Sequence, residues 1–120
     1  MGSDVKSVLV VDDEASLRLL CRVNLEHEGH HVREAESLAE ARELIEKELP
    51  DVILLDVHVG SDDGLELLDE IEALELPVRV VLLSGTSEVG SALRERVDAV
   101  LGKPFELDQL AAAVADCTVR

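Results

Sequence analysis

Acidic side chains follow two short apolar runs of the sequence. Residues 8–11 are Val or Leu and are followed by Asp12 and Asp13, and the apolar residues 52–55 end at Asp56. Apolar runs of this length predict strands that are buried on both faces of a parallel sheet. Ligands of open α/β sheets bind at the carboxyl ends of the strands. The sequence therefore predicts that three carboxylates meet at one edge of a sheet.

Ser84 and Lys103 follow two further predicted strands and belong to the same edge. Close carboxylates require a cation, and carboxylates with a loop carbonyl are hard oxygen ligands that suit Mg²⁺. A serine hydroxyl and a lysine ammonium beside them would bind the oxygens of a phosphoryl group. A carboxylate can itself attack phosphorus and form an aspartyl phosphate. Asp56, at the tip of the central strand, is the candidate nucleophile.

These residues must be positioned by alternating strands and helices. The apolar patterns predict strands over residues 7–12, 31–35, 52–56, 78–84 and 98–101. Apolar residues at helical spacing predict helices over 14–28, from 37 to just before Pro50, after a polar loop at 57–63, over 87–96, and from about Leu107 onward. Five alternations with short connections predict a parallel sheet with helices on both faces.

Several local features are expected within these elements. Ser37 and Glu40 have the spacing of a capping box, and Gly29 is placed to end the first helix. His27, His30 and His31 are interpreted as surface or strand-edge residues. The side chains expected to face the core from the first and third helices are Leu17, Leu20, Cys21, Leu25, Leu67, Leu68, Ile71 and Leu74.

Composition narrows the function classes. The 120 residues are expected to form a single domain over residues 4–120, with no segment apolar enough to span a membrane. A net charge of -16 repels phosphate backbones and disfavours direct nucleic-acid binding, and a single Phe disfavours a base-stacking surface. Cys21 and Cys117 are interpreted as buried free thiols of a cytoplasmic protein.

The motifs, taken in order, resemble the receiver domains of two-component response regulators. They are Val10-Val11-Asp12-Asp13-Glu14, Leu54-Leu55-Asp56, Asp63-Gly64, Leu83-Ser84-Gly85 and Lys103-Pro104-Phe105. The resemblance covers essentially the whole chain. It implies a doubly wound, flavodoxin-like fold with a five-stranded parallel sheet of order 2-1-3-4-5.

The resemblance also implies roles for the acidic residues and the lysine. Asp56 matches the phosphoacceptor, Asp13 a direct Mg²⁺ ligand, and Asp12 a residue that orients metal-bound water. The backbone carbonyl of His58 would complete the metal site. Lys103 matches the lysine that pairs with the phosphoryl group.

Further roles follow from the same resemblance. Ser84 matches the hydroxyl residue that senses the phosphoryl group, and the Lys103–Pro104 peptide is expected to be cis. Gly85 is small, as access to the acceptor requires. Gly85, Thr86 and the side chain of His58 are the positions expected to modulate the reaction.

Besides the loop at residues 57–60, which lacks the usual Met-Pro, two features depart from the family pattern. The switch position carries Val100 where Tyr or Phe is usual, and the chain contains no Tyr. The segment from Ser84 to Lys103 is shorter than is typical, so the helix over 87–96 is expected to be short. Without the aromatic ring, its inward rotation cannot report phosphorylation, and the short helix predicts that output uses a different surface.

The resemblance implies a signalling domain that takes a phosphoryl group from a histidine kinase or a histidine phosphotransfer protein and engages a downstream output domain or protein. It would catalyse only its own phosphorylation and dephosphorylation. The sequence ends with the last helix, so no output domain is expected within it. Two alternatives are a degenerate receiver acting as a constitutive interaction module and a Mg²⁺-dependent phosphatase of the haloacid dehalogenase type. That phosphatase class needs a second Asp where this sequence has His58.

Overall fold

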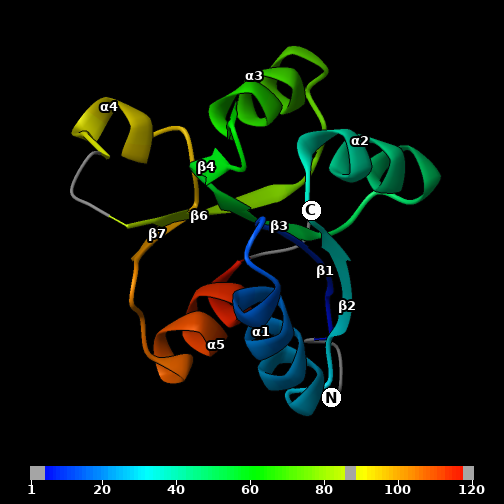
Figure 1. The fold of residues 1–120 in the computed structure, drawn as a ribbon, viewed down its shortest axis with the longest axis vertical. Coiled ribbons are helices and arrows are strands. Elements are labelled where there is room, and N and C mark those ends of the chain that lie inside the picture. Colours follow the sequence, from blue (N-terminus) through cyan, green and yellow to red (C-terminus); the bar gives the residue numbers. More distant parts are fainter. Residues whose placement is uncertain (1–4, 86–88, 118–120) are drawn as a thin grey trace.

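A five-stranded parallel sheet forms the centre of the molecule (Figure 1). The computed structural model describes residues 5–85 and 89–117. In spatial order the strands are β2 (His31–Ala35), β1 (Ser7–Val11), β3 (Val52–Asp56), β6 (Arg79–Ser84) and β7 (Ala99–Gly102). Counted within this sheet alone, the order is 2-1-3-4-5. The predicted doubly wound topology is confirmed.

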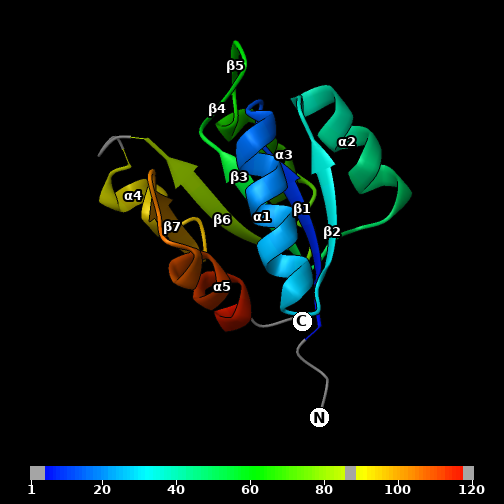
Figure 2. The ribbon, with the colours of Figure 1, turned by 60° about the horizontal axis from the view of Figure 1, so that its bottom comes forward.

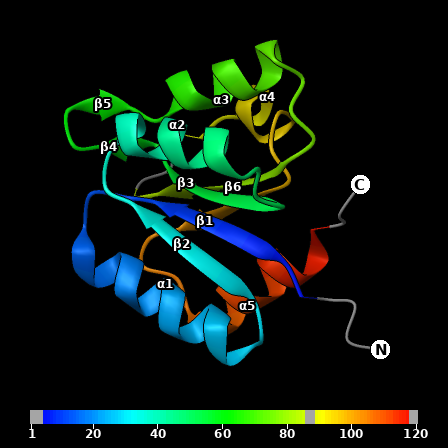
Figure 3. The same cartoon turned by 90° about the vertical axis from the view of Figure 1, so that its right-hand side faces the viewer.

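Helices cover both faces of the sheet (Figure 3). One face carries α1 (Ala15–His27) and α5 (Leu107–Asp116), and the other carries α2 (Leu38–Lys47), α3 (Leu65–Ala73) and α4 (Ser91–Arg94). Successive side chains of a strand point to opposite faces. In β3, Ile53 and Leu55 therefore join the core beneath α2 and α3, while Val52 and Leu54 join the core beneath α1 and α5. This double burial explains why β3 is apolar up to Asp56.

The helix boundaries follow local signals. Ser37 Oγ accepts a hydrogen bond from the Glu40 N–H at 3.1 Å, as the capping box predicted. The Glu40 carboxylate, however, accepts from the N–H of Glu36 rather than of Ser37. Gly29, with φ at 98°, lies in the left-handed region just after α1 and returns the chain toward β2.

The segment predicted as a polar loop is a small hairpin. The strands β4 (His58–Val59) and β5 (Asp62–Asp63) pair antiparallel and project from the carboxyl edge of the sheet (Figure 2). The prediction was wrong because Val57 and Val59 are buried in the core and anchor the base of the hairpin.

Gly64 closes this hairpin against the end of β3. Its N–H donates to the Val57 carbonyl at 2.7 Å. A Cβ atom at this position would collide with the backbone carbonyl oxygen of Asp56. Only a residue without a side chain therefore fits where the hairpin meets the strand.

Two expectations about helix faces were wrong. Leu74 is 69% exposed because α3 ends at Ala73, and Glu75, with φ at 51°, turns the chain away. Leu20 is 46% exposed because the buried face of α1 is narrow and centres on Cys21 and Leu25.

The fourth helix is shorter than its predicted range of 87–96. It begins at Ser91, after Gly90 in an extended conformation, and ends at Arg94. Residues 86–88 lie outside the described part of the chain. The expectation of a short helix here is confirmed.

His30 is buried, contrary to expectation. It follows the Gly29 turn directly, and its Nδ1 accepts a hydrogen bond from the Lys6 N–H at 3.1 Å just before β1. His27 and His31 are exposed, as predicted. No helix within the described ranges is long and apolar enough to cross a membrane.

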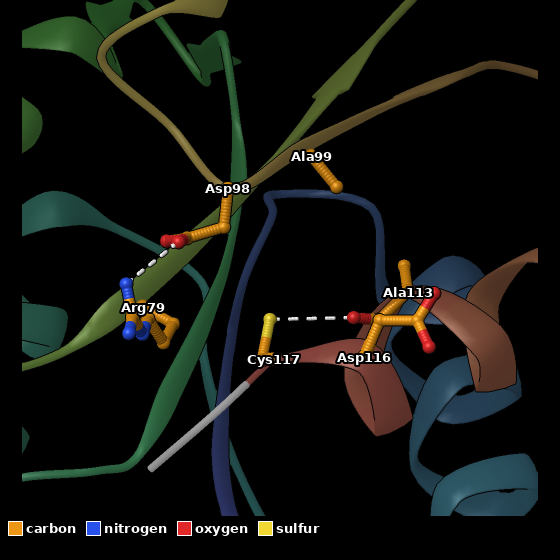
Figure 4. A pocket seen from close by; sticks show the side chains of 6 residues that line it. All are labelled: Arg79, Asp98, Ala99, Ala113, Asp116 and Cys117. Carbon is orange, nitrogen blue, oxygen red and sulfur yellow. Dashed lines mark hydrogen bonds and ion pairs between the residues drawn. The ribbon is translucent and has the colours of Figure 1, made fainter. Parts of the chain in front are cut away.

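A cavity of about 240 Å³ lies near the start of β6 and β7, away from the strand tips (Figure 4). Arg79 Nη1 and Asp98 Oδ1 form an ion pair of 3.0 Å at its border. The Sγ of Cys117 donates to the Ala113 carbonyl at 3.3 Å. Both Cys117 and Cys21 are buried and free of disulfides, as predicted.

The two thiols are expected to be unreactive in the folded protein. Burial raises the pKa of Cys21 to about 12 and that of Cys117 to about 11, so both stay protonated at about pH 8. Titration with a chromogenic disulfide reagent should give slow labelling in buffer and complete labelling of both thiols in denaturant. Rapid labelling of the native protein would contradict this burial.

Replacement of Gly64 by Ala should destabilise the protein by about 1–3 kcal/mol, because the added methyl group displaces the end of β3. Gly90→Ala is the matched control, since a Cβ there meets nothing within 4 Å. Urea unfolding of both variants measures the difference. Equal stability of the two variants would mean that the hairpin relaxes without cost.

Candidate functional site

Lys103 joins two carboxylates at the carboxyl edge of the sheet. Its Nζ donates to Asp12 Oδ2 at 2.9 Å and to Asp56 Oδ2 at 2.8 Å. The three residues follow or end β7, β1 and β3, and lie far apart in the sequence. The structure therefore brings together three of the five side chains that the sequence placed at one sheet edge.

Asp12 is fully buried, and both its backbone and its carboxylate are hydrogen-bonded. Its N–H donates to the Ala35 carbonyl, and its Oδ1 accepts from the Glu14 N–H at 2.8 Å. Its carbonyl accepts from Arg18 Nη1 at 2.7 Å. Burial raises the pKa of the Asp12 carboxyl, hydrogen bonds from Lys103 and Glu14 oppose that rise, and the charge of Asp56 adds to it.

Asp56 ends β3 and is 7% exposed. Its Oδ1 accepts a hydrogen bond from the His58 N–H at 3.2 Å, while its Oδ2 accepts from Lys103. The following residue, Val57, donates its N–H to the Leu83 carbonyl of β6. The carboxylate is thus held by the hairpin on one side and by the ammonium on the other.

Lys103 is positioned by the backbone of the neighbouring strand. Its N–H donates to the Ser84 carbonyl at 2.6 Å, which continues the pairing of β6 with β7. The peptide between Lys103 and Pro104 is cis, as predicted. Burial alone would lower the pKa of Lys103, but its hydrogen bonds to Asp56 and Asp12 and the negative charges of both carboxylates raise it. Lys103 is therefore held in its charged form.

Asp13 completes an acidic cluster. Carboxylate oxygens of Asp12, Asp13 and Asp56 all lie within 4.8 Å of one another, and Asp13 is the exposed member. One ammonium against three carboxylates leaves two uncompensated negative charges. This all-oxygen set fits a hard divalent cation such as Mg²⁺, which takes few protein ligands and keeps bound waters.

The other predicted residues have mixed placements. Ser84 is buried at the end of β6, and Gly85 beside it is exposed, where an added methyl group would meet nothing within 4 Å. His58 is exposed on the hairpin. Val100 is half-buried in β7 and packs against the core under α2 and α3. Thr86 lies outside the described residues.

A groove of about 430 Å³ opens beside the ammonium. Its lining residues come from α1, the end of β6 and the turn before α5: Glu14, Leu17, Leu20, Gly85, Lys103, Pro104 and Phe105. The site is therefore open to solvent on the side of Lys103.

Sequence reasoning missed Arg18. Its guanidinium contacts the Asp12 carbonyl and, through Nε, Glu34 Oε1 at 3.1 Å. The available signal was its spacing, because Arg18 precedes Cys21 and Leu25 by three and seven residues and shares their buried helix face.

Comparison with known proteins gives the same result along nearly the whole chain. Residues 8–115 match the model of the response regulator receiver domain. The chain is 28% identical to sporulation initiation phosphotransferase F of Bacillus subtilis, covering 91% of this chain and 90% of that protein. It is 32% identical to the virulence transcriptional regulatory protein PhoP of Salmonella typhimurium, covering 88% of this chain but 48% of that protein.

Solved structures of receiver domains have the same fold as this chain. The receiver domain of NtrX from Brucella abortus superposes with a TM-score of 0.82 at 34% identity, covering 92% of this chain and 99% of that one. The signal receiver domain of a Vibrio parahaemolyticus LuxO repressor protein gives a TM-score of 0.85 at 27% identity, covering 92% and 88%. The chain belongs to the response regulator receiver domain family.

Proposed function

We propose that this domain, extending over residues 4–120, accepts a phosphoryl group on Asp56 with the help of Mg²⁺ and so changes its interactions with a partner. The observation that carries the proposal is the bridge from Lys103 to Asp56 and Asp12, with Asp13 exposed beside it. The arrangement combines a nucleophile, a cation for phosphoryl oxygens and a carboxylate cluster for a metal.

The proposed donor is the phosphohistidine of a histidine kinase or a histidine phosphotransfer protein. The Asp56 carboxylate attacks phosphorus, and the P–O bond forms as the P–N bond breaks. The bonding electron pair leaves with the protonated imidazole, which departs as the neutral ring. The product is an aspartyl phosphate, and no further substrate is turned over.

The surrounding residues divide the remaining tasks. The Lys103 ammonium transfers one hydrogen bond from the Asp56 carboxylate to the phosphoryl group, and the Ser84 hydroxyl binds another of its oxygens. Asp13, Asp56 and the His58 carbonyl would hold the Mg²⁺, while Asp12 orients its water. The metal, when bound, neutralises charge on the phosphoryl oxygens. Gly85, Thr86 and the His58 side chain are the positions proposed to modulate loss of the phosphoryl group.

The alternatives are less well supported. A phosphatase of the haloacid dehalogenase type requires a second acid two residues after the nucleophile, where His58 stands. A degenerate receiver would not need the complete set of Asp12, Asp13, Asp56 and Lys103.

The chain covers 90% of the sporulation phosphotransferase but only 25% of the alginate regulator AlgB of Pseudomonas putida. We therefore propose that the downstream partner is either a domain attached to this one or a separate protein in the cytoplasm.

Asp56→Asn should abolish phosphorylation. Incubation of the unaltered protein with Mg²⁺ and acetyl phosphate should add one phosphoryl mass in intact mass spectrometry, and the variant should gain none because an amide is not a nucleophile here. Omission of Mg²⁺ should also prevent the adduct. An adduct of equal yield on the variant would exclude Asp56 as the acceptor.

Mg²⁺ should raise the thermal unfolding temperature. A ligand that binds only the folded state at a hundred times its dissociation constant adds about 2.7 kcal/mol of stability. Asp13→Asn should remove most of this gain. Glu43→Gln, which removes the same charge from an exposed position of α2, should keep it and controls for general screening of the -16 charge. Loss of the gain in both variants would contradict a specific site.

A further inference from the structure

Arg18 of α1 contacts the backbone where Asp12 leads into Asp13. Its side chain is only 13% exposed, although it belongs to α1 near the molecular surface. The Nη1 group donates to the Asp12 carbonyl at 2.7 Å, and Nε donates to Glu34 Oε1 of β2 at 3.1 Å. The guanidinium therefore connects α1, β2 and the end of β1.

The Asp12 carbonyl belongs to the peptide group that leads into Asp13. A peptide group is planar, so holding its oxygen also holds its nitrogen and limits where the Cα of Asp13 can lie. The Asp12 side chain is held separately by Lys103 and the Glu14 N–H. Asp13 is exposed, and its location depends on the backbone that Arg18 holds.

We propose that Arg18 is a positioning residue for the metal site: it orients the Asp12–Asp13 peptide so that Asp13 can bind Mg²⁺ while Asp12 orients the metal-bound water. This inference rests on the proposed function, because it assumes that the acidic cluster binds a divalent cation. Arg18 acts through the Asp12 backbone carbonyl rather than through a carboxylate of the cluster.

Charge and positioning make opposite predictions for this residue. A guanidinium near the cluster repels a divalent cation, so its removal should tighten Mg²⁺ binding if charge were its only effect. If Arg18 instead orders the turn, its removal should weaken binding. The sign of the change therefore distinguishes the two roles.

The decisive variant is Arg18→Met, which keeps the length and apolar stem of the side chain but removes both donors. We expect Mg²⁺ binding, measured by isothermal titration calorimetry, to weaken by about tenfold, as is typical when a residue that orients metal ligands is lost. Arg22→Met is the matched control: it removes the same charge four residues away and also breaks an ion pair with Glu34, of 3.2 Å, but leaves the contact between Arg18 and the Asp12 carbonyl in place. Its Mg²⁺ affinity should stay unchanged or rise slightly.

A second variant, Glu34→Gln, tests the same role if Arg18→Met fails to fold. Glu34→Gln leaves Arg18 and its charge in place but weakens the anchor on β2, and should also lower Mg²⁺ affinity. In the metal-free proteins, the Asp13 amide resonance should shift in both Arg18→Met and Glu34→Gln but not in Arg22→Met. A merely stabilising role would change the unfolding temperature without moving that resonance.

The possible outcomes separate this inference from the function it rests on. Unchanged or tighter Mg²⁺ binding in Arg18→Met, with normal binding by the parent protein, would overturn the positioning role alone. Absence of Mg²⁺ binding by the parent would overturn the proposed metal-dependent function, and this inference with it.

Discussion

The hydrogen bonds from one ammonium to two carboxylates are the constraint on which this structure depends. Asp12 and Asp56 lie at the ends of neighbouring parallel strands, so their charges converge wherever the sheet forms. Two carboxylates this close and this buried cannot both stay ionised without a compensating charge. Lys103 supplies it from the other side of β6, and its own N–H binds the Ser84 carbonyl. The charge balance therefore spans the sheet from β1 to β7.

The hydrophobic framework and the polar edge have opposite requirements. The interior strands are buried on both faces, which stabilises the fold through apolar burial along their length. The carboxyl ends of the same strands carry acidic side chains and backbone polar groups. These groups are suited to binding a cation and do not pack into an apolar core. The tight approach of Gly64 to Asp56 shows how closely the hairpin must fit against this edge. The apolar strands thus position three carboxylates, of which the Lys103 ammonium neutralises only one negative charge.

The region between Ser84 and Lys103 shows how the family pattern can change while the site stays intact. α4 is reduced to four residues, and the segment after it is held by Arg96, whose Nη2 pairs with Asp69 and Glu72 of α3 at 2.6 and 2.7 Å. Val100 fills the half-buried position in β7 with a small aliphatic side chain. Neither change touches the bridge from Lys103 to Asp12 and Asp56, since that bridge depends on strand register.

The sequence by itself determined the order of strands and helices, the bounds 31–35 and 52–56 of two strands, and the acids and lysine at their edge. It could do so because double burial produces unbroken apolar runs and parallel strands share a carboxyl edge. Only the tertiary structure decided that His30 is buried, that Leu20 and Leu74 are exposed, and that residues 58–63 form a hairpin. It alone placed Gly64 against Asp56 and Arg18 on the Asp12 carbonyl. These features depend on which surfaces distant segments cover and where backbone groups meet, and neither is encoded in the local pattern of apolar and polar residues.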